Sequence, residues 1–212
     1  MSGLPSNPSH EPQPVWELAT MYPAQGCWSE EEYLELTEGT NRLIELTDGS
    51  LEFLALPTRV HQRIVTFLLA VFSAFVDARQ LGEVLPGGIR IRTADGKFRI
   101  PELIFLSWEK EAAWGGDRFL RGTDIAVEVV SDDDQSHRHG YALKVATYAA
   151  AGIPEYWIVD PGDKKIVVYC LDSGAGSYTE HGTFKPGESA TSVLFDGFAV
   201  DVAAVFDAAK LR

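Results

Sequence analysis

The chain has 212 residues, of which 45% are hydrophobic and 23% are charged, and its formal net charge is −13 at pH 7. This composition is typical of a folded domain, and the length favours a single domain with a sizeable core. The negative charge argues against a protein that coats nucleic acid through charge alone. Cys27 and Cys170 are too few for a disulfide framework or a zinc cluster.

The N-terminal segment has the composition of a tail. Four prolines stand among polar residues in positions 1–14, so we expect residues 1–24 to be disordered or loosely packed. The chain opens without a basic-then-apolar signal pattern, and no apolar run approaches the roughly 18 residues that cross a membrane. We therefore expect a cytoplasmic protein with a single domain over residues 25–212.

The first elements have clear local signals. Ser29 and Glu32 fit a capping box, which predicts a short helix that ends near Leu36. The dipeptide Asp48-Gly49 is typical of a β-hairpin, and it is flanked by predicted strands at 42–46 and 50–55. Glu45 lies within the first of these strands.

A long amphipathic helix comes next. Thr58 can cap it, and the helical pattern continues to about Ala78, with His61 in the first turn. The apolar spacing predicts a buried face made of Val60, Ile64, Phe67, Leu68, Val71 and Phe75.

One basic cluster interrupts this acidic chain, around the turn Asp95-Gly96. Its members are Arg90, Arg92, Lys97 and Arg99. The cluster could guide a phosphate backbone, although a charged hairpin turn is equally ordinary. A strand at 102–106 and a loop at 108–121 are predicted to follow.

The stretch from residue 123 to residue 161 organises the chain. Two short apolar runs, 125–130 and 156–159, flank a segment with helical periodicity, which predicts two parallel strands joined by a helix. The first run is apolar on both faces and is therefore expected to be a central strand. Antiparallel strands at 165–171 and 177–184 and a short helix at 202–209 complete a mixed α/β fold.

Two charged residues interrupt this central unit. Glu128 lies in the middle of the first strand, and Lys144 lies at the edge of the helical stripe formed by Tyr141, Val145 and Tyr148. A buried charge without a partner costs several kcal/mol, roughly. We expect the two side chains to face each other, either as a structural ion pair or around a metal or an anion.

A further acid, Glu102, is placed to join Glu128 and Lys144 in one site. Glu102 opens a predicted strand directly after Pro101, and if that strand neighbours the one with Glu128, both carboxylates can point to one edge of the sheet. Two close carboxylates repel unless a divalent cation joins them, and oxygen ligands of this kind suit Mg²⁺ or Mn²⁺. Such a cation lowers the pKa of a bound water, and a neighbouring lysine can orient that water or neutralise developing charge.

Several motifs carry a family resemblance: Pro101-Glu102, Glu128-Val129-Val130-Ser131, Lys144, Tyr148 and the segment GIPEYWIVD at 152–160, which is the most specific. Together they resemble the Uma-two family, a branch of the PD-(D/E)xK restriction-endonuclease-like superfamily. The segment 44–49 looks like the early hairpin of that family, with a histidine near the start of the next helix, here His61. The resemblance covers roughly residues 29–205.

The resemblance implies a restriction-endonuclease-like fold and hydrolysis of DNA phosphodiester bonds with Mg²⁺ or Mn²⁺. Carried over by position, Glu102 and Glu128 are the metal carboxylates, Lys144 is the superfamily lysine moved onto the helix, and Glu45 is an additional acid of the site. Glu102 stands where the family usually has Asp, and Gly140 stands where it usually has an acid.

Two other functions remain open. A nuclease fold that has lost catalysis can persist as a module that binds nucleic acid or protein. Alternatively the chain is a structural homo-oligomer, since Trp108, Trp114 and Phe119 could cover a partner. We expect DNA and a second copy of the chain as partners, with a dimer favoured. Binding of a divalent metal separates the enzyme from both alternatives.

Overall fold

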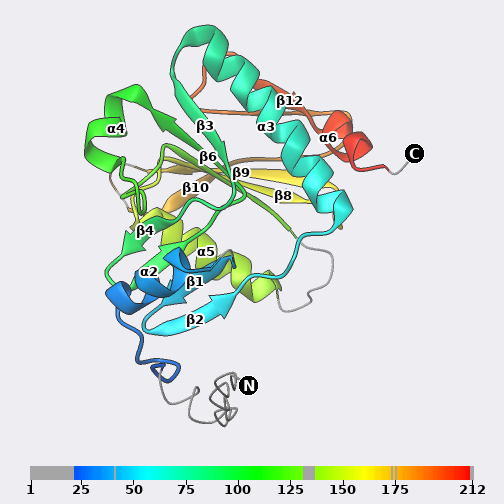
Figure 1. Ribbon diagram of the computed structural model, residues 1–212. Coiled ribbons are helices and arrows are strands. Elements are labelled where there is room, and N and C mark those ends of the chain that lie inside the picture. Colours follow the sequence, from blue (N-terminus) through cyan, green and yellow to red (C-terminus); the bar gives the residue numbers. More distant parts are fainter. Residues whose placement is uncertain (1–21, 41, 131–136, 173, 175, 211–212) are drawn as a thin grey trace, which may run out of the picture.

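The computed structural model describes residues 22–40, 42–130, 137–172, 174 and 176–210, without the side chains of 137–142. The segment 1–24 that was expected to be a loose tail lies almost wholly outside these residues. A mixed sheet crosses the molecule, with α3 and α6 on one face and α5 on the other (Figure 1). A smaller sheet and α2 lie beside α5 (Figure 1).

The helices are α2 (Glu30–Glu38), α3 (Arg59–Arg79), α4 (Trp108–Trp114), α5 (His137–Ala150) and α6 (Val202–Ala208). The strands are β1 (Ile44–Thr47), β2 (Ser50–Phe53), β3 (Gly82–Pro86), β4 (Ile91–Ala94), β5 (Lys97–Arg99), β6 (Leu103–Ser107), β7 (Ile125–Val129), β8 (Glu155–Asp160), β9 (Lys165–Leu171), β10 (Tyr178–Phe184), β11 (Ser189–Thr191) and β12 (Ala199–Asp201). Among the described residues they form sheets of order β10-β9-β8-β7-β6-β3, β2-β1-β5-β4 and β11-β12.

The central strand–helix–strand unit has the predicted form. β7 lies between β6 and β8, pairs in parallel with β8, and is buried along its whole length. The remaining pairs of the large sheet are antiparallel, including the predicted pair β9–β10. The predicted mixed α/β fold with a partly parallel sheet is confirmed.

Local sequence signals explain where α2 and α3 begin and where the β1–β2 hairpin turns. The capping box is present, with the Ser29 hydroxyl accepting from the Glu32 N–H and the Glu32 carboxylate accepting from the Ser29 N–H. In the β1–β2 hairpin, Asp48 and Gly49 have φ of 47° and 79°, the left-handed pair that a two-residue turn requires. The Thr58 hydroxyl caps α3 as predicted, accepting from the His61 N–H at 3.2 Å.

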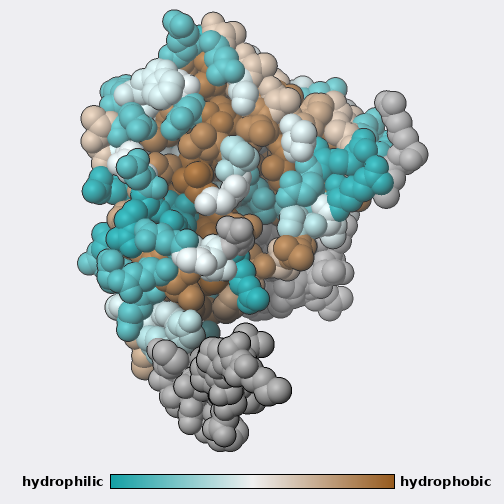
Figure 2. Space-filling view, viewed as in Figure 1, coloured by the Kyte–Doolittle hydropathy of each residue, from teal (hydrophilic) through white to brown (hydrophobic). Residues whose placement is uncertain are grey.

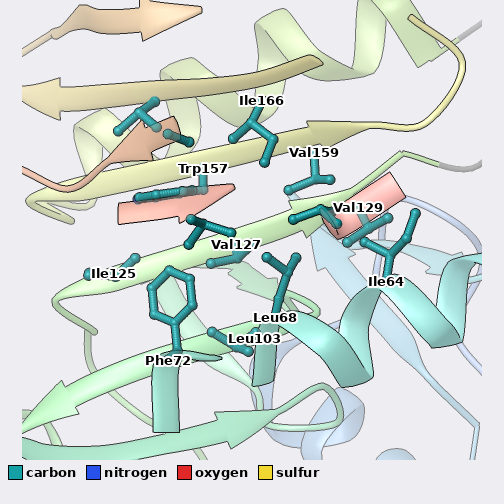
Figure 3. Close-up of a cluster of buried hydrophobic side chains, with 14 of the residues drawn as sticks. Ile64, Leu68, Phe72, Leu103, Ile125, Val127, Val129, Trp157, Val159 and Ile166 are labelled. Carbon is teal, nitrogen blue, oxygen red and sulfur yellow. The ribbon is translucent and has the colours of Figure 1, made fainter. Parts of the chain in front are cut away.

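The main core lies between α3 and the large sheet. One face of α3 packs on the sheet with Ile64, Leu68 and Phe72. Figure 3 shows these side chains together with the sheet residues of the same cluster, including Trp157. The predicted buried face was only partly right, because Phe72 and Val76 are fully buried whereas Phe67, Val71 and Phe75 are partly exposed. The residues spaced by four from Ile64 form the ridge that faces the sheet, and Phe75 packs instead on Phe195 and Phe198.

Two boundary predictions were wrong. The stretch 108–121 was expected to be a loop, yet it opens with the short helix α4, because Glu109 to Ala113 are strong helix formers. A seven-residue helix is too short to give a periodic apolar pattern. Strand β6 begins at Leu103, so Glu102 lies just before the strand.

A membrane span can also be sought by helix length and mean composition, without requiring an unbroken apolar run. Among the described residues, α3 passes that test by length and composition. It is nevertheless amphipathic, since Ile64, Val65, Leu68, Phe72 and Val76 are buried while Gln62 and Thr66 are exposed. A helix with one apolar face that packs on a sheet is a core helix.

We expect Phe72→Ala to lower the free energy of unfolding by about 3–5 kcal/mol, because it leaves a cavity against Trp157, Phe195 and Phe198. The matched change Phe53→Ala, at a side chain 54% exposed, should cost about 1 kcal/mol or less. Urea unfolding measures both. Equal losses would show that α3 does not anchor the core.

Candidate active site

Glu128 is the centre of the site. It lies near the end of β7, is 7% exposed, and points toward α5. Its Oε2 accepts from the Lys144 ammonium at 2.9 Å, and its Oε1 accepts from the Tyr148 hydroxyl at 2.8 Å. The two donors are four residues apart and so share one face of α5. The structure therefore brings Glu128 and Lys144 together as expected, and adds Tyr148.

Both donors keep their protons at neutral pH. Burial lowers the pKa of Lys144, but the charges of Glu128 and Glu45 outweigh it and raise the pKa above the ordinary value. Burial and the Glu128 charge both raise the pKa of Tyr148. Lys144 is thus a lasting cation rather than a base, and its side chain is still 28% exposed.

Glu45 belongs to the same electrostatic group. It is 1% exposed, its Oε1 accepts from the Ile100 N–H at 2.9 Å, and its Oε2 lies 3.7 Å from Nε of Arg99. Burial raises the pKa of Glu45, Lys144 lowers it and Glu128 raises it again. Two acids and two cations therefore share a largely buried region and balance its charge.

Glu102 has a different partner. Its Oε1 lies 3.2 Å from Nε2 of His61, in the first turn of α3, and the same nitrogen lies 3.2 Å from the carbonyl oxygen of Val129. His61 is 5% exposed, and its Nδ1 finds no hydrogen-bond partner within the described part of the chain. Burial lowers the pKa of His61, but the hydrogen bond and charge of Glu102 outweigh it and raise the pKa.

Glu102, just before β6, and Glu128, in β7, lie at the same end of the large sheet, because Leu103 pairs with Val127 in antiparallel register. Their side chains contact helices that cover opposite faces: Glu102 contacts α3, and Glu128 contacts α5. Across the described ranges, no group of three or more His, Cys, Asp and Glu side chains is placed to hold a metal ion. Glu45, Glu102 and Glu128 are therefore not placed as one group of three metal ligands. The smaller pair of Glu102 and Glu128 as metal carboxylates stays a prediction.

His61 is the residue that sequence reasoning undervalued, since it was noted only for its place in the first helical turn and was not given a role in the site. Its ring instead contacts a predicted site acid and the main chain of β7. The one sequence signal was its place after the early hairpin, in the first turn of a helix. Nothing local to the sequence shows that this turn lies against the ends of β6 and β7.

Most of the predicted basic cluster is used inside the fold. Arg92 pairs with Glu30 and Asp95, Lys97 with Asp48, and Arg99 is buried beside Glu45. The contacts of Glu30 with Arg92 and with the Gly96 N–H join α2 to the β4–β5 hairpin, where hydrophilic side chains gather on the surface (Figure 2). Contact of this cluster with nucleic acid stays a prediction, and Arg99 is too buried to make one without opening the fold.

A partly parallel mixed sheet with helices on both faces, and a Glu–Lys pair where its central strand ends, defines a restriction-endonuclease-like α/β protein. The chain belongs to the Uma2 family, whose model, described as "Putative restriction endonuclease", matches residues 30–203. The predicted family is thereby confirmed.

The solved structures that share the fold include a protein described as a "putative nuclease belonging to DUF820" from Anabaena variabilis ATCC 29413. The similarity has a TM-score of 0.71 and covers 89% of this chain and 100% of the other, at 18% sequence identity. At that identity the likeness shows the fold alone. A search of curated proteins gave no match.

We expect His61 to titrate above its ordinary pKa of 6.5, since the carboxylate of Glu102 favours the imidazolium. Glu102→Gln removes that charge while burial remains, so the pKa should fall. The histidine ring resonances in NMR spectra across pH measure it. Glu52→Gln, at an exposed acid of β2, is the control and should leave the His61 titration unmoved. An unchanged titration in Glu102→Gln would show that the contact is absent in solution.

The raised pKa of Glu45 predicts a signed pH effect. Because the folded state holds the proton more tightly, the contribution of Glu45 to stability is fully present below about pH 4.5 and is lost as pH rises through the folded pKa. The free energy of unfolding of the parent, minus that of Glu45→Gln, should therefore decrease above pH 4.5. Urea unfolding from pH 4 to pH 8 measures this difference, and an increase would contradict the assignment.

Proposed function

We propose that this protein is an endonuclease that hydrolyses phosphodiester bonds in DNA with a divalent cation, Mg²⁺ or Mn²⁺. Membership of the Uma2 family supports a nuclease, and restriction-endonuclease-like families generally use divalent metals. The observation that carries the proposal is the contact of a lasting cation, Lys144, with the buried carboxylate of Glu128.

The oxygen atoms at this end of the sheet suit such a cation. The carboxylate of Glu102 and the carbonyl oxygen of Val129 each lie 3.2 Å from Nε2 of His61, so two oxygen acceptors lie near each other around that ring. Each oxygen of Glu128 accepts one hydrogen bond and keeps a lone pair. Hard oxygen donors of this kind bind Mg²⁺, and Glu102, Glu128 and Val129 are the residues that would hold it. When bound, the cation supplies an acidified water and positive charge for a phosphate.

Lys144 has a role that does not need proton transfer. Its raised pKa rules it out as a general base at neutral pH, while its partial exposure lets a substrate approach the ammonium. A fixed positive charge at this point orients an attacking water and neutralises charge that develops on the phosphate. In our proposal Lys144 acts as this fixed charge.

Tyr148 and Glu45 are positioning residues. The Tyr148 hydroxyl holds one oxygen of Glu128, so that the carboxylate cannot rotate when Lys144 contacts a substrate. Glu45 adds negative charge that keeps Lys144 protonated. Sites of this kind require side chains held to about half an ångström.

A second function has its own support. Glu102 is engaged by His61, and the described side chains form no group of three or more metal-binding residues. A nuclease fold that binds nucleic acid without cleaving it agrees with both facts. The cytoplasmic location and the homodimer remain predictions from the sequence.

The test of the proposed function is Lys144→Met, which keeps the volume and removes the charge. Without metal, Glu128 loses a partner, and stability should fall by about 3 kcal/mol, the lower end for a broken buried pair because Lys144 is 28% exposed. Mg²⁺ should restore much of this loss, since the cation can satisfy Glu128. Cleavage of plasmid DNA should be absent in both conditions.

Lys110→Met is the matched control, because Lys110 also pairs with a buried acid, Asp124 at 2.6 Å, but at the opposite end of β7. It should lose stability with or without Mg²⁺ and should still cleave DNA. A Lys144→Met protein that cuts like the parent would remove Lys144 from the mechanism. If neither the parent nor Lys110→Met cleaves single- or double-stranded DNA, the endonuclease proposal is wrong and the binding function is favoured.

A further inference from the structure

A pocket of about 270 Å³ lies between the end of α2 and the loop that joins β3 to β4. Its polar lining comes from Thr37, Thr40, Arg42 and Arg90, and its apolar wall includes Ile100. The volume is just under the range of small-ligand sites, roughly 300–1,000 Å³. A sugar–phosphate unit is the scale of ligand that such a pocket holds.

The lining of this pocket carries positive charge and no acid. That is unusual in a chain with 31 acidic and 18 basic residues. Arg42 is exposed, and within the described ranges neither Arg42 nor Arg90 pairs with a carboxylate. Arg92, Lys97 and Arg99 are paired, as described above. The two arginines of the pocket are therefore free to bind an anion.

The pocket is also arranged for an anion. The Arg90 guanidinium donates to the Thr37 hydroxyl, which fixes its position and leaves further N–H donors. The Thr40 hydroxyl accepts from the main-chain N–H of Arg42 at 3.3 Å, which fixes the backbone at the rim of the pocket. The Thr37 hydroxyl already donates its proton to the Tyr33 carbonyl oxygen at 2.8 Å, so the donors to an anion would be the guanidinium groups and the Thr40 hydroxyl. A planar guanidinium matches the geometry of a phosphate.

The pocket shares a wall with the candidate active site. Ile100 lines the pocket, and its N–H donates to Glu45 at 2.9 Å. Glu102 follows two residues later, and its carbonyl oxygen accepts from the Gly87 N–H at 2.8 Å, next to Gly88 of the pocket lining. A ligand in the pocket thus lies beside the main chain that carries Glu102.

We propose that this pocket binds a backbone phosphate of the DNA strand, adjacent to the phosphate that is cleaved at Glu102 and Glu128. This inference rests on the proposed function, because it assigns the pocket a place in the same substrate complex. The phosphate of a free nucleotide has the same chemistry, so the experiment includes both ligands.

The first arm uses thymidine 5′-monophosphate without metal, and measures the melting temperature. The parent should be stabilised by mass action, and the shift should disappear in Arg42→Gln and Arg90→Gln. Arg79→Gln is the matched control, because Arg79 stacks on Phe75 at the other end of α3, about 27 Å along the helix from His61. It should respond like the parent.

The second arm uses a fluorescent single-stranded oligonucleotide in EDTA, and measures anisotropy over a salt series. Arg42→Gln should weaken binding about ten-fold, the effect of one charged hydrogen-bond partner. The slope of the logarithm of affinity against the logarithm of salt should fall by about 0.7, the value for one lost phosphate contact. Arg79→Gln should leave both quantities unchanged.

The outcomes separate the two proposals. If Arg42→Gln binds the oligonucleotide with the affinity and salt slope of the parent, the pocket proposal is wrong, even when DNA is cleaved with Mg²⁺. If the monophosphate binds but the oligonucleotide does not, the ligand is a free nucleotide, and the proposal is again wrong. If both arms give the expected result but Mg²⁺ produces no cleavage, the pocket is supported and the endonuclease proposal fails.

Discussion

The carboxylate of Glu128 imposes a requirement that shapes the centre of the molecule. It sits on a strand that is buried on both faces, where an unpaired charge costs several kcal/mol, roughly. The helix that connects β7 to β8 must therefore present donors to that strand, and it presents Lys144 and Tyr148 on one face. Glu45 and Arg99 extend the arrangement into the smaller sheet, so the two sheets are joined by charge as well as by packing.

Such a network is a poor way to stabilise a fold, because the cost of removing charges from water offsets most of their attraction. An apolar pair at positions 128 and 144 would hold β7 against α5 at least as well. The stabilising role in this protein belongs to the other face, where α3 packs Phe72 against Trp157. The charged face is thus better explained by chemistry than by stability.

The arginines in and beside the smaller sheet fall into two groups, according to whether a carboxylate is within reach. Where a carboxylate is within reach, as for Arg92 beside Glu30, the pair joins α2 to the β4–β5 hairpin. Where it is not, as for Arg42 and Arg90, positive charge remains beside the backbone of Glu102. The net charge of −13 repels a polyanion, but the free arginines of the pocket attract it locally. The pocket would therefore bring such a substrate close to the acids of the candidate site.

The sequence by itself determined whatever depends on neighbours in the chain: the capping box at Ser29, the hairpin turn at Asp48-Gly49, and the apolar runs of β7 and β8. It also predicted that Glu128 and Lys144 meet, since a buried acid and a buried lysine in consecutive elements lower each other's cost of burial. Only the tertiary structure decided that Phe72 rather than Phe67 is fully buried against the sheet, that His61 contacts Glu102, and that Arg99 is buried beside Glu45. Each of those contacts joins elements that are far apart in the chain. Packing between distant elements leaves no periodic signal in the sequence. Several residues of one helix or strand look equally suited to a given contact, and only the folded structure shows which of them makes it.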